Sequence, residues 1–344
     1  MFTVGVVTSY ATSLKVVGET IVYALNRMEY ISKLYTWLLP WHEAKRQFER
    51  GIVFIPFDPI YLPSWVLLQR DYATHGIPAF TYVTVEGLPK KHLIYDWIKR
   101  DGLFVANSRY TYEMLQKADV NVLDVVYHGI NMEEVKLAKP YKEELKQELN
   151  GKIVFGTVST PIPRKGLEKL AKAINIFTEK HDDARFYILT KQEGASIFYD
   201  VKGAYVDTRY GELTRTEVLS LMASFDYYLC PSLSEGFCLP IVESQALGVP
   251  VIHPEYAPLT EVADPKASYT FPYIEEKWVD LGYGMLFHFH EYDIEDMLEQ
   301  MELAYDTYLN NRDEYDDRCS RAREFSTKFD ALETYKKFPK LLGL

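Results

Sequence analysis

The sequence predicts an α/β protein with two doubly wound, Rossmann-like domains. Residues 2–8 (FTVGVVT) form a short apolar run that is followed by a polar loop and a helical segment. This is the order of a first strand, loop and helix in a doubly wound sheet. The same order begins again at residues 152–158 (KIVFGTV). Because 344 residues are too many for one ordinary domain, two such units are expected.

The first domain is predicted over residues 1–135. Its strands are expected at short apolar runs, which are typical of parallel strands covered on both faces. After the first strand these runs are 34–39, 51–57, 78–85, 103–106 and 122–127. Helices are expected near residues 18–28, 42–50, 65–74 and 109–117, the last of them capped by Asn107 and Ser108.

The second domain is predicted over residues 136–325. The highly charged stretch 132–150 at its start is expected to form a linker and a solvated helix. Strands are then expected at 152–158, 184–189, 203–206, 226–230 and 251–252, and helices at 167–177, 214–224, 292–310 and 313–329. Residues 326–344, with a helix near 331–342, form a final segment of their own.

Residues 232–250 (SLSEGFCLPIVESQALGVP) combine a loop, a short helix and the return to a strand. Pro240 suits the first helical position and Gly248 the helix end. Backbone N–H groups at a helix N-terminus bind anions, and here they belong to Gly236, Phe237, Cys238 and Leu239. Glu235 and Glu243 flank them as acceptors for hydroxyl groups. A nucleotide sugar is such a ligand, because its diphosphate lies between a sugar and a ribose.

Arg164 and Lys165 precede the helix that starts at residue 167. Positive side chains at this end oppose the helix dipole, and a bound anion would remove the conflict. They therefore indicate a phosphate site. The alternative for Arg164 is a side chain that is simply solvated.

Two candidates fall in the first domain. Glu86 follows the strand 78–85, and ligands of open α/β sheets bind beyond the carboxyl ends of strands. Glu86 is therefore placed to meet the donor sugar or the acceptor, or else it caps the following turn. Gly18 is expected near a helix N-terminus that a phosphate or hydroxyl could approach, or else it is a plain helix-start glycine.

Composition and charge exclude several classes. A net charge of −11 and a pI of about 5.3 argue against nucleic-acid binding, which needs a basic face. Cys230, Cys238 and Cys319 lack metal-site spacing, which favours a reduced, cytoplasmic setting. No signal peptide or membrane-spanning run is evident, although a local basic patch would allow peripheral membrane contact. No acidic pair stands out as a metal site, and the oligomeric state stays open.

Residues 235–243 (EGFCLPIVE) resemble the EGFGLPxxE signature of the retaining family-4 glycosyltransferases. The flanking segments 226–232 (DYYLCPS) and 246–252 (ALGVPVI) agree with this family, as does the pair Lys165-Gly166. The resemblance implies the GT-B fold, in which two Rossmann-like domains face each other across a cleft. It also implies that the C-terminal helix crosses back to the first domain.

The resemblance implies a metal-independent transfer of sugar, with retention, from a UDP- or GDP-type sugar to a glycan, lipid or protein acceptor. Glu235 would orient the donor sugar near its 3- or 4-hydroxyl, and Glu243 would accept hydrogen bonds from the ribose. Lys165 and Arg164 would bind the diphosphate, and Tyr210 could stack on the base. No further cofactor is implied.

The chain departs from the family pattern at three places. It has Val17-Gly18 where the family usually has a glycine pair, and Glu86 where a histidine often stands. Thr160 occupies the position of the usual arginine, for which Arg164 could substitute. Two alternatives remain. One is a GT-B nucleotide-sugar epimerase, and the other is a nucleotide-sugar-binding protein without activity, which these departures support. The presence of both signature glutamates and of Lys165 favours the enzyme.

Overall fold

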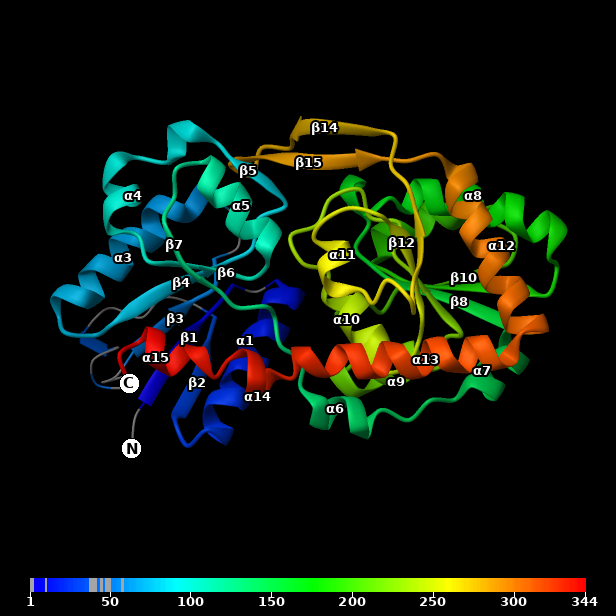
Figure 1. The fold of residues 1–344 in the computed structure, drawn as a ribbon, viewed down its shortest axis with the longest axis horizontal. Coiled ribbons are helices and arrows are strands. Elements are labelled where there is room, and N and C mark those ends of the chain that lie inside the picture. The colour runs from blue at the N-terminus through cyan, green and yellow to red at the C-terminus, as the bar shows by residue number, and fades with distance from the viewer. Residues whose placement is uncertain (1–2, 10, 37–41, 44–45, 47–50, 57–58) are drawn as a thin grey trace. The chain divides into compact units, whose positions relative to one another are not determined.

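A computed structural model describes residues 3–9, 11–36, 42–43, 46, 51–56 and 59–344 (Figure 1). The chain forms two compact units, and each is treated by itself. The first unit comprises Met1–Asn131, Trp278–His288 and Lys328–Leu344, and the second comprises Met132–Lys277 and Phe289–Thr327. The predicted ranges 1–135, 136–325 and 326–344 are continuous segments, whereas the first unit also takes in the inserted segment Trp278–His288.

The first unit is built on a six-stranded parallel sheet in the order β2-β1-β3-β4-β6-β7. The strands are β1 (Thr3–Val7), β2 (Ile31–Tyr35), β3 (Gly51–Phe54), β4 (Ala79–Val83), β6 (Phe104–Ala106) and β7 (Val122–Val125). All residues of β3, β4 and β6 are buried, which is why these strands appear in the sequence as largely apolar runs. The predicted strand 34–39 begins earlier, at Ile31, and its last residues lie outside the described residues.

Helices of the first unit flank this sheet. They are α1 (Thr12–Arg27), α3 (Leu62–Thr74), α4 (Asp96–Asp101), α5 (Arg109–Lys117), α14 (Ala331–Thr334) and α15 (Lys337–Leu341). As predicted, Ser108 caps α5, where its hydroxyl accepts a hydrogen bond from the backbone N–H of Thr111 at 3.0 Å. The helix predicted near 42–50 lies mostly outside the described residues.

The C-terminal segment belongs to the first unit, as the predicted fold requires. The ring of Phe338 lies edge-on against Phe80 and Tyr82, each at 5.1 Å between ring centroids. The hydroxyl of Tyr335 accepts a hydrogen bond from the backbone N–H of Gly129 at 2.9 Å. The segment forms two short helices, α14 and α15, rather than the single helix expected at 331–342; both are red in Figure 1.

The second unit contains another six-stranded parallel sheet, in the order β10-β9-β8-β11-β12-β13. Its strands are β8 (Ile153–Val158), β9 (Ala184–Leu189), β10 (Ala204–Asp207), β11 (Tyr227–Leu229), β12 (Val251–Pro254) and β13 (Tyr269–Phe271). Numbered within the unit, the order is 3-2-1-4-5-6, the Rossmann arrangement. The chain reverses its direction of travel between β8 and β11, so this is the topological switch point.

Helices of the second unit pack around an aromatic core. They are α6 (Met132–Leu137), α7 (Lys142–Leu149), α8 (Leu167–Lys180), α9 (Arg215–Ala223), α10 (Leu239–Ala246), α11 (Leu259–Val262), α12 (Ile294–Asn310) and α13 (Arg312–Ser326). Phe155 of β8 stacks on Phe186 and Tyr227 of the neighbouring strands, with centroids 5.1 and 5.5 Å apart. The charged stretch predicted as a linker and one helix therefore contains two helices, α6 and α7.

A third, three-stranded sheet has no counterpart in the prediction. It consists of β14 (Glu275–Asp280), β15 (Met285–Glu291) and β5 (Gly87–Pro89). Most side chains of β14 are exposed, so the sequence EEKWVD has no apolar pattern that marks a strand.

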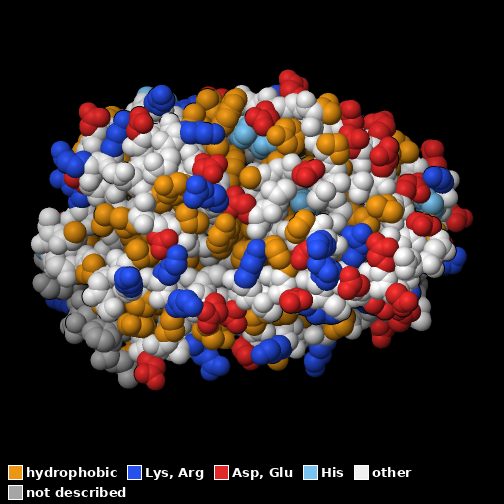
Figure 2. Space-filling view, in the orientation of Figure 1, with side chains coloured by type: hydrophobic (Ala, Val, Ile, Leu, Met, Phe, Trp, Pro, Cys, Tyr) orange, Lys and Arg blue, Asp and Glu red, His pale blue; other side chains and the backbone are white. Residues whose placement is uncertain are grey.

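Two further findings concern the charges on the surface and the length and polarity of the helices. Figure 2 shows lysine and arginine side chains interspersed with aspartate and glutamate over the face in view. Within the described residues, every helix is too short or too polar to cross a lipid bilayer.

Candidate donor-binding site

The strongest candidate site lies in the second unit, beyond the carboxyl ends of β8 and β11. Ligands of open α/β sheets bind at such a switch point, because the loops there diverge and leave room for them. The loop after β8 carries Arg164 and Lys165, and the loop after β11 carries Glu235. The fold therefore brings together residues that are 70 and 71 positions apart in the chain.

Backbone contacts hold these two loops against each other. The N–H of Leu233 donates to the carbonyl oxygen of Arg164 at 2.7 Å. Gly166 has a φ of +67°, and a Cβ at this position would lie 2.0 Å from the carbonyl oxygen of Pro231. Only glycine fits both the left-handed backbone and this close approach. The Lys165-Gly166 pair thus has a structural reason, since the glycine lets the lysine reach the second loop.

Two cations converge on one buried carboxylate. The ammonium of Lys165 lies 2.5 Å from Oε1 of Glu235, and the guanidinium of Arg164 lies 3.1 Å from Oε2. Arg164 also donates to the carbonyl oxygen of Ser234 at 3.0 Å. Its side chain is only 14% exposed, so the solvated alternative for Arg164 does not describe this structure. We call Arg164, Lys165 and Glu235 the Glu235 cluster.

The Glu235 cluster keeps its carboxylate ionised. Burial by itself raises the pKa of Glu235, but Lys165 and Arg164 outweigh burial and hold its pKa below the ordinary value. The cluster therefore has an excess of positive charge, with two cations and one anion. Such an arrangement can accept a further anion.

Acid is expected to weaken this ion cluster and the stability of the protein with it. Because the pKa of Glu235 is lower in the folded state, its stabilising contribution is complete above the ordinary glutamate pKa of about 4.3. The contribution is lost as pH falls through the folded-state value. We expect the difference in Tm between the native protein and Glu235→Gln to narrow below about pH 4.3. An unchanged difference down to pH 3, against an exposed control such as Glu333→Gln, would contradict this assignment.

The N-terminus of α10 provides the predicted backbone donors. The helix begins at Leu239, one residue before the predicted start at Pro240. Gly236 and Phe237 lie in the buried loop that leads into it. Within the described part of the chain, the N–H groups of Cys238 and Leu239 donate to no protein acceptor. They remain able to donate to an anion.

Cys238 holds an unusual backbone conformation at this helix start. Its φ and ψ are 78° and 72°, in the left-handed region that favours glycine, and the resembled signature has glycine there. Its Sγ lies 3.6 Å from that of Cys230, and all three cysteines are free thiols.

Two variants of Cys238 are expected to differ in stability, because only one of them relieves this backbone strain. Cys238→Gly and Cys238→Ala both lose the contact with Cys230, but only glycine relieves the left-handed conformation. We expect Cys238→Gly to be more stable than Cys238→Ala by about 1 kcal/mol, or about 2–4 °C in Tm. Parallel thermal unfolding measures the difference. Equal or reversed stabilities would show that this position carries no strain.

Glu243 projects from the middle of α10 and is paired with Arg215. A guanidinium nitrogen of Arg215 lies 2.5 Å from Oε1 of Glu243. Arg215 also lies 3.5 Å from a carboxylate oxygen of Glu134 on α6. No sequence pattern pointed to Arg215, because it is 28 residues from Glu243 and its role becomes visible only when α9 and α10 are adjacent.

Tyr210 lies in the segment between β10 and α9. Burial raises the pKa of its hydroxyl, Lys165 lowers that pKa and Glu243 raises it. Arg164 also lowers the pKa of Tyr210, and Glu235 also raises it. Tyr210 itself is half-buried. Arg209, its neighbour, is instead held by Asp207 at 2.6 Å.

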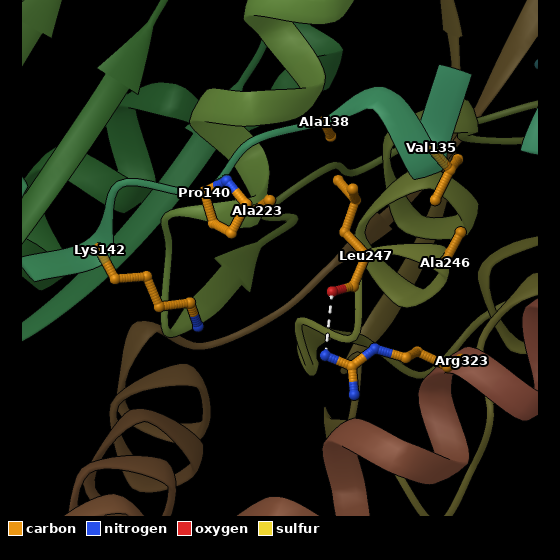
Figure 3. A pocket seen from close by; sticks show the side chains of 8 residues that line it. All are labelled: Val135, Ala138, Pro140, Lys142, Ala223, Ala246, Leu247 and Arg323. Carbon is orange, nitrogen blue, oxygen red and sulfur yellow. Dashed lines mark hydrogen bonds between the residues drawn. The ribbon is translucent and has the colours of Figure 1, made fainter. Parts of the chain in front are cut away.

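The far end of α10 is fixed by Gly248 and Arg323. Gly248 has a φ of +76°, and a Cβ there would lie 2.2 Å from Cζ of Arg323. Arg323 donates to the carbonyl oxygen of Leu247 at 3.5 Å (Figure 3). A pocket of about 220 Å³ beside this end of the helix is lined by Arg323 and Lys142 but by none of the predicted donor residues.

Of the two candidates in the first unit, Gly18 is placed differently from the prediction. α1 begins at Thr12 rather than near Gly18, so the predicted position of Gly18 at a helix N-terminus is wrong. A Cβ on Gly18 would lie 2.6 Å from Cδ1 of Leu34, which gives this glycine a packing reason. Glu86 is half-buried between β4 and β5, beyond the carboxyl end of β4.

His128, a residue of the first unit, has a structural role. It is buried, and its Nε2 lies 3.0 Å from the side-chain nitrogen of Asn107 and 3.3 Å from the hydroxyl of Thr84. Burial lowers its pKa to about 3, so the imidazole is neutral at physiological pH.

Comparison with known proteins agrees with the fold. Residues 152–279 match the family described as Glycosyl transferases group 1. An uncharacterised glycosyltransferase of Sulfolobus islandicus rod-shaped virus 1 is 28% identical over 84% of this chain and 87% of its own length. Sucrose-phosphate synthase from Thermosynechococcus elongatus has a similar structure over 100% of both chains, with a TM-score of 0.72 and 12% identity. The E. coli structure titled trehalose-6-phosphate bound with UDP-2-fluoro glucose covers 99% of both chains, with a TM-score of 0.69 and 12% identity.

These findings define the class of protein: the chain is a glycosyltransferase of the GT-B fold. The match to group 1 covers β8, both loops of the candidate site and the whole of α10. The predicted fold and enzyme class are thereby confirmed.

Proposed function

We propose that this protein transfers a sugar from a nucleotide diphosphate sugar to a hydroxyl of a glycan, lipid or protein acceptor, with retention at the anomeric carbon. The observation that supports this most is the Glu235 cluster beside the N-terminus of α10. Lys165, Arg164 and the N–H groups of Cys238 and Leu239 supply the donors that a diphosphate needs. Retention is proposed from the resemblance of residues 235–243 to the retaining signature.

In the proposed reaction, negative charge develops on the diphosphate beside the cations of the Glu235 cluster. The bond between the anomeric carbon and the diphosphate oxygen breaks, and negative charge grows on the diphosphate. Lys165 and Arg164 stabilise that charge. The acceptor oxygen then bonds to the anomeric carbon on the same face, and its proton passes to the departing diphosphate. Glu235 orients the sugar, and Glu243 accepts from the ribose hydroxyls.

We further propose that the reaction needs no metal ion. A divalent cation serves diphosphate transferases by neutralising the leaving group. The two side-chain cations of the Glu235 cluster exceed its one carboxylate, so they can serve the same purpose. UDP is the first nucleotide to test, because one structure of similar fold is a complex with UDP-2-fluoro glucose.

The proposal is tested by binding and turnover in the presence of a chelator. Thermal shift is measured with UDP, GDP and ADP in EDTA, because a ligand that binds only the folded state raises Tm. Proton NMR then follows hydrolysis of the matching sugar donor. We expect one nucleotide to stabilise the protein and the α-anomer of the sugar to appear first.

Other outcomes point elsewhere. A shift that requires added Mg²⁺ would overturn metal independence, and initial release of the β-anomer would overturn retention. Conversion of the donor to an epimeric nucleotide sugar would identify an epimerase. Binding without hydrolysis or transfer to any acceptor would favour a nucleotide-sugar-binding protein, and no binding at all would overturn the donor site.

A further inference from the structure

Arg215 is a charged residue to which the proposed chemistry gives no role. It is the first residue of α9, where a positive side chain opposes the helix dipole. The helix start is already capped, since Thr214 and Glu217 form a complete capping box. Helix formation therefore gives no reason for an arginine at this position.

The contacts of Arg215 point to Glu243 instead. Its guanidinium lies 2.5 Å from Oε1 of Glu243, whose side chain is only 5% exposed. A buried carboxylate without a partner is costly, so this contact decides whether Glu243 can remain an acceptor in the interior. Glu134 holds the same guanidinium from α6, at 3.5 Å from its Nε. Arg215 on α9 therefore lies between a carboxylate of α6 and one of α10.

The ion pair with Arg215 engages one of the two carboxylate oxygens of Glu243. Among the described residues, Oε1 contacts Arg215 and Oε2 accepts no hydrogen bond. An ionised carboxylate can accept at both oxygens. Arg215 therefore fixes the orientation of the group while Oε2 stays available to a hydroxyl donor.

We propose that Arg215 is a positioning residue that sets the carboxylate of Glu243 for recognition of the ribose hydroxyls. The inference rests on the proposed function, in which Glu243 contacts the ribose. It adds that a 2′-hydroxyl is recognised through a fixed Glu134–Arg215–Glu243 chain rather than by Glu243 alone. Loss of Arg215 should then remove selectivity for the ribose while Lys165 and Arg164 still bind the diphosphate.

The test compares two ligands across matched variants. Isothermal titration calorimetry measures the affinity of UDP and of 2′-deoxy-UDP for the native protein, Arg215→Met, Arg215→Lys and Glu243→Gln. Arg318→Met is the control, because Arg318 forms a comparable pair with Glu314 at 2.8 Å on α13 in the same unit. Thermal unfolding first establishes that each variant folds.

We expect the native protein to prefer UDP roughly tenfold, as for a hydrogen bond to a charged group. Arg215→Met should reduce this preference to within about twofold, mainly by weaker UDP binding. Arg215→Lys, which keeps the charge without the planar fork, should fall between the two. Arg318→Met should keep the full preference.

The contrary outcomes are separable. If Arg215→Met weakens both ligands equally and keeps their ratio, Arg215 is merely structural and the inference is wrong. If Arg215→Met does not fold, the ratio for Arg215→Lys decides in the same way, a full preference overturning the inference. If Glu243→Gln keeps the full preference, the ribose contact of the proposed function fails. If Glu243→Gln loses it while Arg215→Met retains it, the proposed function stands and only the role of Arg215 is overturned.

Discussion

Replacing Glu235 by glutamine is expected to lower kcat/KM for sugar transfer by roughly a hundredfold or more, because the donor sugar loses the group that orients it. The amide keeps the shape of the side chain but removes the charge that Lys165 and Arg164 neutralise at 2.5 and 3.1 Å. UDP binding should be unchanged or tighter, since a negative charge beside the diphosphate site is removed. Calorimetry with UDP and initial rates with the full sugar donor measure the two effects separately.

This split between binding and turnover distinguishes sugar orientation from simple support of the loop. If Glu235→Gln weakens UDP binding as much as it slows transfer, Glu235 serves to hold the cations in place. Retention of full kcat/KM would remove Glu235 from the reaction. The exposed variant Glu333→Gln serves as the control, because Glu333 pairs with Lys336 on the surface of the first unit.

Replacing Lys165 by alanine should weaken UDP binding, unlike the replacement of Glu235. A hydrogen bond between two charged groups contributes about 1.5–3 kcal/mol, so UDP affinity should fall roughly 10- to 100-fold. The rate should fall further, because the lost ammonium also stabilises charge that develops on the leaving group. The pKa of Glu235 should rise as well, since Lys165 is the stronger of the two cations that lower it.

Lys169→Ala provides the matched control for this variant. Lys169 lies in the first turn of α8, just after Lys165 in the chain, but its ammonium lies 3.3 Å from Glu291 and donates to the carbonyl oxygen of Tyr292. Its loss should leave UDP affinity within about twofold of the native value. Equal affinity of UDP for Lys165→Ala and for the native protein would contradict the assigned diphosphate contact.

Most of the fold could be predicted from the sequence, because the signals for strands and helices are local. Strands such as β4 and β9 are almost entirely buried, so each is marked by a short and largely apolar run. Ser108 and Thr214 mark the starts of their helices, because their side chains form N-caps. β14 was missed for the same reason, since its exposed residues alternate in no pattern that a strand would impose.

The prediction of the candidate site depended on how far each residue's signal extends along the chain. Glu235 and Glu243 belong to one continuous segment and were found together. Gly18 was misplaced because the start of α1 has no side-chain cap, its N-cap residue being Ala11. Arg215 carries no signal of its own, because an arginine at a helix start is usually exposed.

The sequence by itself determined that this chain would form two parallel α/β units and that residues 235–243 would place N–H donors between two carboxylates. Those features depend on apolar runs, caps and turns within a few residues. Only the tertiary structure decided which cations meet which carboxylates. β8 lies next to β11 in the sheet, so Lys165 reaches Glu235 across 70 residues of chain. Likewise α9 and α10 are adjacent, so Arg215 reaches Glu243. Side-chain charge pairs follow the order of strands and helices in space, and that order results from burial of the whole core rather than from any single segment.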